Sequence, residues 1–476
     1  MKPLADDLAS LHPRPGIEDL FMTRRDFLAR SGSGFGLAAL AALMASGELP
    51  GFELVGQDSN FSPLAPKKPH TAGKAKRVLQ IFAQGAPTQI DTWDPKPELK
   101  RVDGQSIPGR RNGTAFGSPF DFTPQGQSGL EMSPVFPRMA AHADKLAVVR
   151  SMHTDIPAHD TAQVMFNTGS LRRIMPSVGS WVLYGLGSEN QSLPGFVALS
   201  NGNINPNNMR SAFLPGAFQG TQVNARARRP EDLIANIRNR NVSLPEQRRQ
   251  LDLLHTLNEV HKQKMRKDGQ LEARLQAYEL AFKMQMEAID AFDAAKEPDA
   301  VQDMYGNSNE GRQMLIARRL LERGVRFVQV WHGGWDHHNN IATRLPQKAG
   351  EIDGPMAALI TDLEQKGMLD DTLIFWGGEF GRTPNADGPV GSPGRNHNSR
   401  AFSVVMAGGG VKGGMAYGAT DELGAAAVEN KVHIHDFHAT LLAALGFDHE
   451  KLTFRHQGRD FRLTDVYGNV AKDILT

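Results

Sequence analysis

The sequence predicts an α/β protein whose doubly wound, mostly parallel sheet carries helices on both faces. Six short, nearly continuous apolar runs are typical of strands that are covered on both faces. Amphipathic helical patterns lie between several of these runs, and such alternation favours a parallel sheet. The predicted strands are residues 77–83, 146–152, 196–200, 325–331, 372–378 and 402–409.

Three of the helical patterns end at a glycine, which is a common helix stop. They are residues 311–324, 355–367 and 435–446, and their last residues are Gly324, Gly367 and Gly446. Residues 230–300 depart from the alternation, because they are highly charged and have apolar residues at three- and four-residue spacing. We therefore expect a folded domain at 77–476 with a helical insertion at 230–300.

The N-terminal residues predict an export signal. Arg24 and Arg25 precede Phe27, Leu28 and a weakly apolar Gly/Ala-rich run at 34–45, which is too short to span a bilayer comfortably. This pattern is typical of a twin-arginine signal, and we assign it residues 1–46 and the periplasm or cell envelope as destination. No clean A-x-A cleavage site follows, so a retained signal helix is the one predicted membrane contact.

Composition excludes several classes of partner and site. Residues 47–76 are rich in Pro, Gly and Ser and are predicted to be a linker. The net charge of +1 and the lack of a basic stripe with aromatic residues argue against nucleic acid. Cysteine is absent, so any metal ion must be held by His, Asp and Glu. The sequence does not indicate an oligomeric state.

Ligand-type side chains gather where the predicted strands end. In open α/β sheets, ligands bind beyond the carboxyl ends of the strands, where loops share a crevice. Imidazoles with carboxylates suit zinc, manganese or iron better than calcium, and such an ion takes about four to six ligands. The candidates for this crevice are His153, His159, His332, Asp336, His337, His338, Glu379 and His397.

Two other patterns are better explained by structure than by chemistry. His433, His435 and His438 lie around a helix start, where capping by Asp436 and packing are the favoured interpretation. Residues 408–414 are glycine-rich but lack the spacing of a phosphate-binding loop, so a tight loop is expected.

Long motifs give the chain a resemblance to a known family. They include TRRDFL, GAPTQIDTWDPKP, RFVQVWHGGWDHHNN, DDTLIFWGGEFGRTP, GRNHN, AGGGVKGGMAYGATDE, HDFHATLLAALG and QGRDFRLTDVYGNV. The sequence resembles the exported bacterial family called domain of unknown function 1501. The resemblance covers the signal and nearly all of the chain from Arg77 to the end. That family is similar to the alkaline phosphatase and sulfatase superfamily. The resemblance implies a doubly wound fold with one or two metal ions at the strand ends.

The resemblance also implies roles for individual residues. Asp336 and His337 would be the principal metal ligands, with His332 or His338 nearby, and His397 matches a final ligand histidine. Glu379 stands where the superfamily has an aspartate of an Asp-His pair, and is assigned to the metal as well.

Three positions depart from the superfamily pattern. Gln84 replaces the aspartate usual after the first strand, and Phe380 replaces a ligand histidine. The nucleophile position, about ten residues before the Thr168–Gly169 pair, is His159, with Thr161 the nearest hydroxyl. These departures favour one divalent metal ion, zinc or manganese, rather than two.

Two catalytic residues are proposed from the same resemblance. His159 is a third metal ligand, a general base or a nucleophile, and the sequence does not rank these. Arg382 either clamps the oxygens of an anion or pairs with a nearby carboxylate.

The sequence thus predicts an exported metal-dependent hydrolase of a phosphate or sulfate ester, acting on a small anionic ester or an envelope polymer. One alternative is a non-catalytic cell-envelope binding protein with a degraded hydrolase site. Another is a metalloenzyme of different chemistry that uses a histidine-rich site with one ion.

Overall fold

The structure is a computed structural model that describes residues 63–107, 113–227, 230–233, 242–264, 275, 278–279, 282–283 and 290–476. The predicted signal region 1–46 and the first part of the predicted linker lie outside these residues, as does much of the predicted insertion. All described residues belong to the unit Phe61–Thr476.

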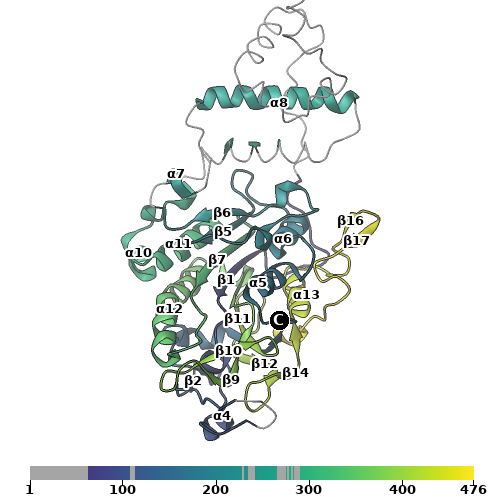
Figure 1. Ribbon diagram of the computed structural model, residues 1–476. Helices are drawn as coiled ribbons and strands as arrows, with labels where there is room; N and C mark the ends of the chain where they lie inside the picture. Colours follow the sequence, from purple (N-terminus) through teal and green to yellow (C-terminus); the bar gives the residue numbers. More distant parts are fainter. Residues whose placement is uncertain are drawn as a thin grey trace, which may run out of the picture. The chain divides into compact units, whose positions relative to one another are not determined.

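A large sheet forms the centre of the described chain, as Figure 1 shows. Among the described residues, nine strands join in the order β12-β4-β11-β8-β1-β7-β5-β6, with β15 paired to β4. These strands are β1 (Arg77–Gln84), β4 (Leu146–His153), β5 (Phe196–Ser200), β6 (Thr221–Asn224), β7 (Phe327–Gly333), β8 (Thr372–Gly377), β11 (Phe402–Ala407), β12 (Met415–Tyr417) and β15 (Val432–His433). All six predicted strands are confirmed, with ends shifted by at most two residues.

The sheet is parallel except around β11. Strand β1 pairs in parallel with β7 and β8, and β5 pairs in parallel with β6 and β7. Strand β11 pairs antiparallel with both β8 and β4. The loop before β11 therefore lies at the edge where the parallel strands end, which brings the GRNHN motif to the same edge as the other loops.

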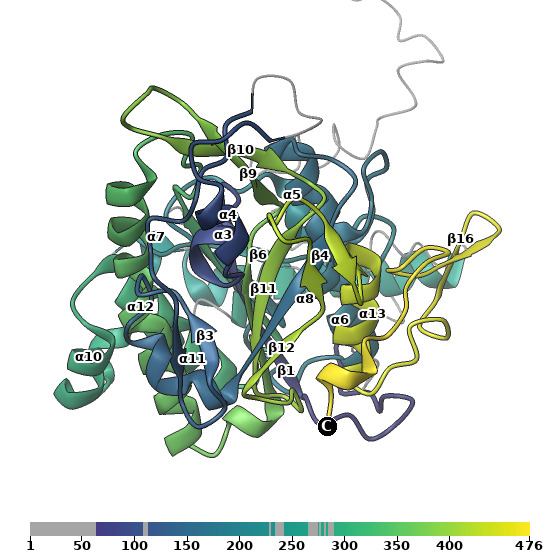
Figure 2. The same ribbon diagram turned by 90° about the horizontal axis from the view of Figure 1, so that it is seen from below.

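Two helical layers cover the two faces of the sheet (Figures 1 and 2). Side chains of β1 alternate between the layers, as strand geometry requires. Leu79 and Ile81 pack with α11 (Asn309–Glu322) and α12 (Ile341–Gln365), whereas Val78 and Phe82 pack with the other layer. That second layer contains α5 (His159–Thr168), α6 (Val178–Leu186) and α13 (Ile434–Ala444). The predicted doubly wound α/β fold is confirmed.

Smaller elements surround this core. The remaining helices are α3 (Gln89–Thr92), α4 (Pro97–Arg101), α7 (Pro230–Leu233), α8 (Leu244–Lys264) and α10 (Asp299–Tyr305). The strand pairs outside the sheet are β2 (Thr123–Gln125) with β3 (Leu130–Met132), β9 (Gly381–Asp387) with β10 (Gly394–Asn398), β13 (Ala419–Thr420) with β14 (Ala427–Glu429), and β16 (Phe454–His456) with β17 (Arg459–Phe461). Helices α7 and α8 fall within the segment predicted to be a helical insertion.

The described end of the predicted linker packs on the domain. The Lys67 amide donates to the Leu186 carbonyl at 2.8 Å, and the Ala75 amide donates to the Ala444 carbonyl at 3.1 Å. None of the helices in the described ranges combines the length and the hydropathy that a membrane crossing needs.

A buried polar network fixes α5 on the sheet. Gln80 of β1 donates to Asn167 Oδ1 of α5 at 3.0 Å, and Gln329 of β7 donates to the same oxygen at 3.0 Å. Gln329 also donates to Gln80 Oε1 at 2.9 Å, and all three side chains are fully buried. Because a buried amide without partners costs free energy, this network favours one position of α5. Helix α5 begins at His159.

A buried ion pair ties α3 to the β9–β10 ribbon. Asp91 of α3 accepts from Arg395 Nε at 2.6 Å and from Arg395 Nη2 at 2.9 Å, and both side chains are fully buried. Arg395 lies two residues before His397. The pair therefore anchors the segment that carries one of the predicted ligands.

Replacing Arg395 by Met is expected to lower the free energy of unfolding by about 3–5 kcal/mol, because the buried Asp91 carboxylate loses its charged partner and keeps only the hydrogen bond from Thr88 at 2.6 Å. Chemical denaturation measures the change. The matched control is Arg455→Met, which removes an exposed pair with Asp460 at 3.1 Å and should cost less than about 1 kcal/mol. Equal losses in the two variants would show that burial of the Asp91–Arg395 pair has no such effect.

Candidate metal centre

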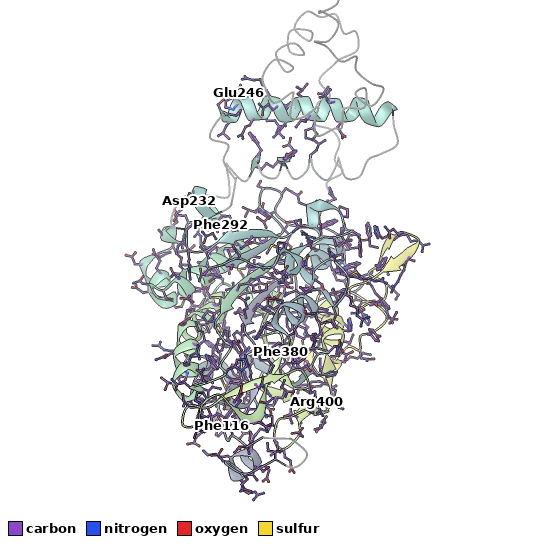
Figure 3. All side chains as sticks on the ribbon, in the orientation of Figure 1. Phe116, Asp232, Glu246, Phe292, Phe380 and Arg400 are labelled. Carbon is purple, nitrogen blue, oxygen red and sulfur yellow. The ribbon has the colours of Figure 1, made fainter. Side chains whose placement is uncertain are left out.

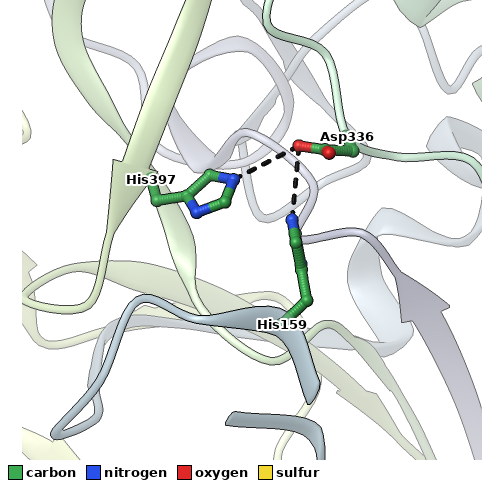
Figure 4. Close-up of side chains that lie close together, drawn as sticks. All are labelled: His159, Asp336 and His397. Carbon is green, nitrogen blue, oxygen red and sulfur yellow. Dashed lines mark hydrogen bonds and ion pairs between the residues drawn. The ribbon is translucent and has the colours of Figure 1, made fainter. Parts of the chain in front are cut away.

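Three segments meet at the carboxyl ends of the central strands. His159 is the first residue of α5, Asp336 and His338 follow β7, and His397 lies in β10. Figure 4 shows His159 and His397 directed at the Asp336 carboxylate. The eight candidates from the sequence thus contribute four side chains to one cluster, which we call the Asp336 cluster.

A single carboxylate oxygen is the centre of this cluster. Asp336 Oδ1 lies 3.4 Å from His159 Nε2, 3.4 Å from His397 Nε2 and 2.9 Å from His338 Nε2. Arg382 Nη2 donates to the same oxygen at 2.5 Å. His338 Nε2 and His397 Nε2 are 2.9 Å apart. Three imidazole nitrogens and one guanidinium therefore converge on one atom.

Hydrogen bonds on the far side of each ring determine which nitrogen carries the proton. The Nδ1 atoms lie 2.7 Å from Glu379 Oε1 for His159, 2.9 Å from the Pro157 carbonyl for His397 and 2.7 Å from Asp387 Oδ2 for His338. Carbonyl and carboxylate oxygens accept, so each Nδ1 donates. In the neutral form each imidazole has one N–H, so each Nε2 then directs a lone pair toward Asp336, and that of His338 also accepts from Arg382 Nη1 at 3.4 Å.

This arrangement fits a metal ion better than a hydrogen-bond network. His159 Nε2 is buried and has no hydrogen-bond partner among the described residues. Metal-binding histidines almost always donate their other N–H to a carboxylate or carbonyl, as all three rings do here. Ligand atoms around a tetrahedral zinc ion are about 3.3 Å apart, and edges of an octahedral site are about 3 Å. The separations from Asp336 Oδ1 are 2.9–3.4 Å. The ligand atoms of His159, Asp336 and His397 all lie within 4.8 Å of one another, and His338 Nε2 borders this set through Asp336 and His397.

The charge balance around the cluster is negative. The carboxylates of Asp336, Glu379 and Asp387 contact the cluster, and among the described residues bonded to it Arg382 supplies the one guanidinium, so with neutral imidazoles two negative charges are uncompensated. A divalent cation would neutralise them. Burial opposes protonation of His159, yet the hydrogen bond and charge of Glu379 raise its pKa above the usual value. The pKa of His159 is raised because the neighbouring carboxylates of Glu379 and Asp336 favour a positive charge on the ring.

Arg382 is a positioning residue in this structure. Its side chain is 1% exposed, and its guanidinium also donates to the Ala86 and Gly85 carbonyls at 2.8 and 2.5 Å. Burial alone would raise the pKa of Asp336, but the hydrogen bond and charge of Arg382 hold it below the usual range. The carboxylate is thereby kept ionised, and the two lone pairs of Oδ1 allow it to accept from Arg382 and still bind an ion.

Glu379 lies behind His159, outside the set of converging atoms. It is fully buried and accepts from the Gly85 amide at 3.0 Å in addition to His159 Nδ1. Phe380, labelled inside the α/β body in Figure 3, packs on the rings of His159 and His397 with centroids 4.9 and 4.8 Å away.

His337 is directed away from the cluster. Its ring is 2% exposed and lies beside Trp335, and its backbone carbonyl accepts from the Arg395 amide at 3.0 Å. Burial lowers the pKa of His337 to about 4. Among the described residues, two groups of histidine and carboxylate side chains are close enough to hold a metal ion, His159 with Asp336 and His397, and His332 with Glu310 and Glu351; His337 belongs to neither.

Two further candidates also lie elsewhere. His332 Nε2 bonds to Glu351 Oε2 at 3.0 Å, and the ring of His153 lies 5.1 Å from that of His433. His338 and His159 join the cluster instead. The sequence indicates His338 only as a neighbour of the ligands, and it leaves three possible roles for His159.

Close backbone contact holds the Asp336 loop against β1. Gly85 follows β1 with φ of +109°, and a Cβ placed there would lie 2.8 Å from the Asp336 amide nitrogen. No side chain fits at this position without displacing the loop.

A family model decides the classification. The model described as "Protein of unknown function (DUF1501)" matches residues 75–475. The chain belongs to this family. No curated protein matches it.

Solved structures similar to this DUF1501 chain are sulfatases and members of the alkaline phosphatase superfamily, as the motifs predicted. PsFucS1 sulfatase from Pseudoalteromonas sp. has 13% identity and a TM-score of 0.34, with 79% of this chain and 68% of that chain covered. Alkaline phosphatase from the Antarctic bacterium TAB5 has 12% identity and a TM-score of 0.29, with coverage of 71% and 92%. Lipoteichoic acid synthase LtaP from Listeria monocytogenes has 8% identity and a TM-score of 0.33, with coverage of 84% and 78%. At these TM-scores the alignments say nothing about chemistry.

Replacing Gly85 by Ala is expected to destabilise the domain more than a glycine substitution in open space. The matched control is Gly458, which has φ of +83° and no atom within 4 Å of the position that a Cβ would occupy. Both variants incur backbone strain, and Gly85→Ala should cost about 1–3 kcal/mol more because the Cβ overpacks the Asp336 loop. Thermal or chemical denaturation compares them, and an equal cost would contradict the close contact.

Proposed function

We propose that this protein is an exported, metal-dependent hydrolase of a phosphate or sulfate ester. The observation that carries the proposal is the convergence of three imidazole lone pairs on Asp336 Oδ1 at the carboxyl ends of the strands. In this proposal His159, Asp336, His338 and His397 hold one divalent ion, zinc or manganese. The ion would polarise an ester oxygen and lower the pKa of a bound water.

The cluster is accessible from solvent, which a hydrolase requires. The side chain of Asp336 is 44% exposed, and those of His338 and His159 are 36% and 26% exposed. Glu379 and Arg382 behind them are buried. An ester can therefore approach from the open side, while the buried residues keep His159 and Asp336 in place.

Water is the proposed nucleophile. Thr161, the nearest hydroxyl in the sequence, lines a separate pocket with Arg172 and Asn205. The described residues around Asp336 Oδ1 supply only nitrogen contacts, and His159 directs Nε2 into the cluster itself. We assign His159 as a ligand rather than a nucleophile, and Arg382 as the residue that orients Asp336 rather than an anion clamp.

The second candidate function is a non-catalytic binding protein of the cell envelope. Phe380 favours it, because an apolar ring that packs on both His159 and His397 stands where the resemblance implies a ligand histidine for a second metal ion. For export we retain the twin-arginine signal at Arg24 and Arg25 as part of the proposal. Turnover of aryl phosphate or aryl sulfate esters by the purified protein separates the two functions.

Replacing His397 by Ala is expected to abolish retention of the ion and hydrolysis, because one of four ligands is lost. Metal analysis of the purified variant and assays with aryl phosphate and aryl sulfate esters measure both. His456→Ala, a partly exposed histidine that stacks on Phe213 at 5.0 Å, is the control and should behave like the wild type.

Undiminished metal content in both His397→Ala and His159→Ala would remove the metal site. Normal metal content with no turnover of either ester over a wide pH range would instead favour the binding protein.

Replacing Glu379 by Gln is expected to weaken zinc affinity by about 10–100-fold without abolishing binding, because Glu379 orients His159 instead of contacting the ion. Competition with a chelator of known affinity measures the change. Asp387→Asn, behind His338, should have an effect in the same range. Complete loss of binding in Glu379→Gln would show that Glu379 is itself a ligand.

A further inference from the structure

A polar pocket distinct from the Asp336 cluster is lined by Asp155, four residues before His159, and by residues of the C-terminal part of the chain. It has a volume of about 640 Å³, within the range of small-molecule sites. Its lining includes Asp155, His433, His435, Tyr467 and Asn469. The sequence predicts capping and packing for these histidines. The capping is confirmed, since the His433 amide donates to Asp436 Oδ2 at 2.9 Å and His433 Nδ1 accepts from the His435 amide at 3.3 Å.

Capping leaves the His435 ring unexplained. This side chain is 5% exposed and lines the pocket, yet its buried Nδ1 has no hydrogen-bond partner among the described residues. Burial lowers the pKa of His435 to about 4, so the ring is neutral and offers one donor and one acceptor. Its Nδ1 lies on the buried side of the ring near Gly169, so His435 contributes to the pocket mainly as a rigid neutral ring that supports Tyr467.

An exposed aromatic ring lies next to His435. Tyr467 stacks on His435 with centroids 5.0 Å apart and an interplanar angle of 26°. Its side chain is nevertheless 60% exposed, and Val466 beside it is 66% exposed. The stacking on His435 orients the tyrosine ring, while its exposed surface is available for contact with a ligand.

The polar groups of the pocket select the ligand's chemistry. Asp155 is 53% exposed and lies 3.3 Å from His433 Nε2, and Asp436 is already bonded to backbone amides. Carboxylates accept from hydroxyl groups and repel phosphate, which argues against a nucleotide. Among the described residues, the groups with metal-ligand convergence do not include this one, which argues against a metal ion.

A sugar ring combines the required features, because it presents an apolar C–H face to an aromatic ring and hydroxyl groups around its rim. We propose that this pocket binds a sugar ring of a glycan. The pocket adjoins the Asp336 cluster through one short segment: Asp155 lines the pocket, and the Pro157 carbonyl accepts from His397 Nδ1 at 2.9 Å. The backbone of Asp155 therefore lies at most about 7 Å from that of Pro157.

The short segment between the pocket and the cluster suggests a substrate class for the proposed hydrolase. This part of the inference rests on the proposed function. A glycan held by Tyr467 and His435 would present an ester on a neighbouring position to the Asp336 cluster. The substrate class would then be a phosphorylated or sulfated glycan. Sugar binding itself requires no metal ion and no turnover.

Binding of unesterified oligosaccharides tests the pocket directly. The probes are cellohexaose and the hexamer of N-acetylglucosamine, and calorimetry or saturation-transfer NMR measures their binding to the full chain. We expect at least one to bind, Tyr467→Ala to weaken its binding about 10-fold or more, and Asp155→Asn to weaken it too. The control Tyr278→Ala removes another exposed tyrosine and should leave binding unchanged.

Binding should also survive in His397→Ala, which separates this proposal from the metal site. If the sugar binds while the wild-type protein holds no metal and turns over neither ester, the hydrolase fails while the pocket stands. If neither oligosaccharide binds the wild type, or if Tyr467→Ala binds as tightly as the wild type, the sugar pocket is overturned whatever the metal analysis gives.

Discussion

The Asp336 cluster depends on one electrostatic constraint, the convergence of unshared electron pairs on a single carboxylate oxygen. Lone pairs from His159, His338 and His397 repel one another and the ionised carboxylate unless positive charge lies among them. Arg382 supplies one such charge from the buried side. The negative charge that Arg382 leaves uncompensated is one physical reason to infer a cation. The other is that the Nδ1–H donors of the three rings are already bonded to acceptors outside the cluster.

The fold supplies the rigidity that this convergence requires. The amide network of Gln80, Asn167 and Gln329 fixes the helix that begins at His159. The Asp91–Arg395 pair anchors the ribbon that carries His397, and Gly85 allows the first loop to lie against the Asp336 backbone. Each anchor is buried and lies close in the chain to a ligand or to the loop that holds one, so stability and site geometry share the same contacts.

Sequence patterns could predict the sheet and its active edge because continuous apolar runs are a strong signal for buried strands. They could also predict that His397 lies near Asp336, although the reason is the antiparallel direction of β11. The spacing between His159 and the Thr168–Gly169 pair equals the length of α5, which ends at Gly169 with φ of +68°. The position that the resemblance assigns to a nucleophile is therefore the first residue of α5.

The choice between neighbouring histidines was beyond the sequence. Asp336, His337 and His338 are consecutive, and the turn after β7, with Gly334 at φ of +96°, directs His337 into the interior and His338 toward the cluster. No periodicity governs such a loop. Glu379 was similarly ambiguous, because a carboxylate that holds a ligand histidine has the same sequence signal as a carboxylate that holds the ion. The most direct measurement is a crystal structure of zinc-loaded protein with anomalous data at the zinc edge. We predict one strong peak bonded to Asp336 Oδ1 and to Nε2 of His159, His338 and His397; a peak bonded to His337 or Glu379 instead, or no peak at the cluster, would contradict the proposed site.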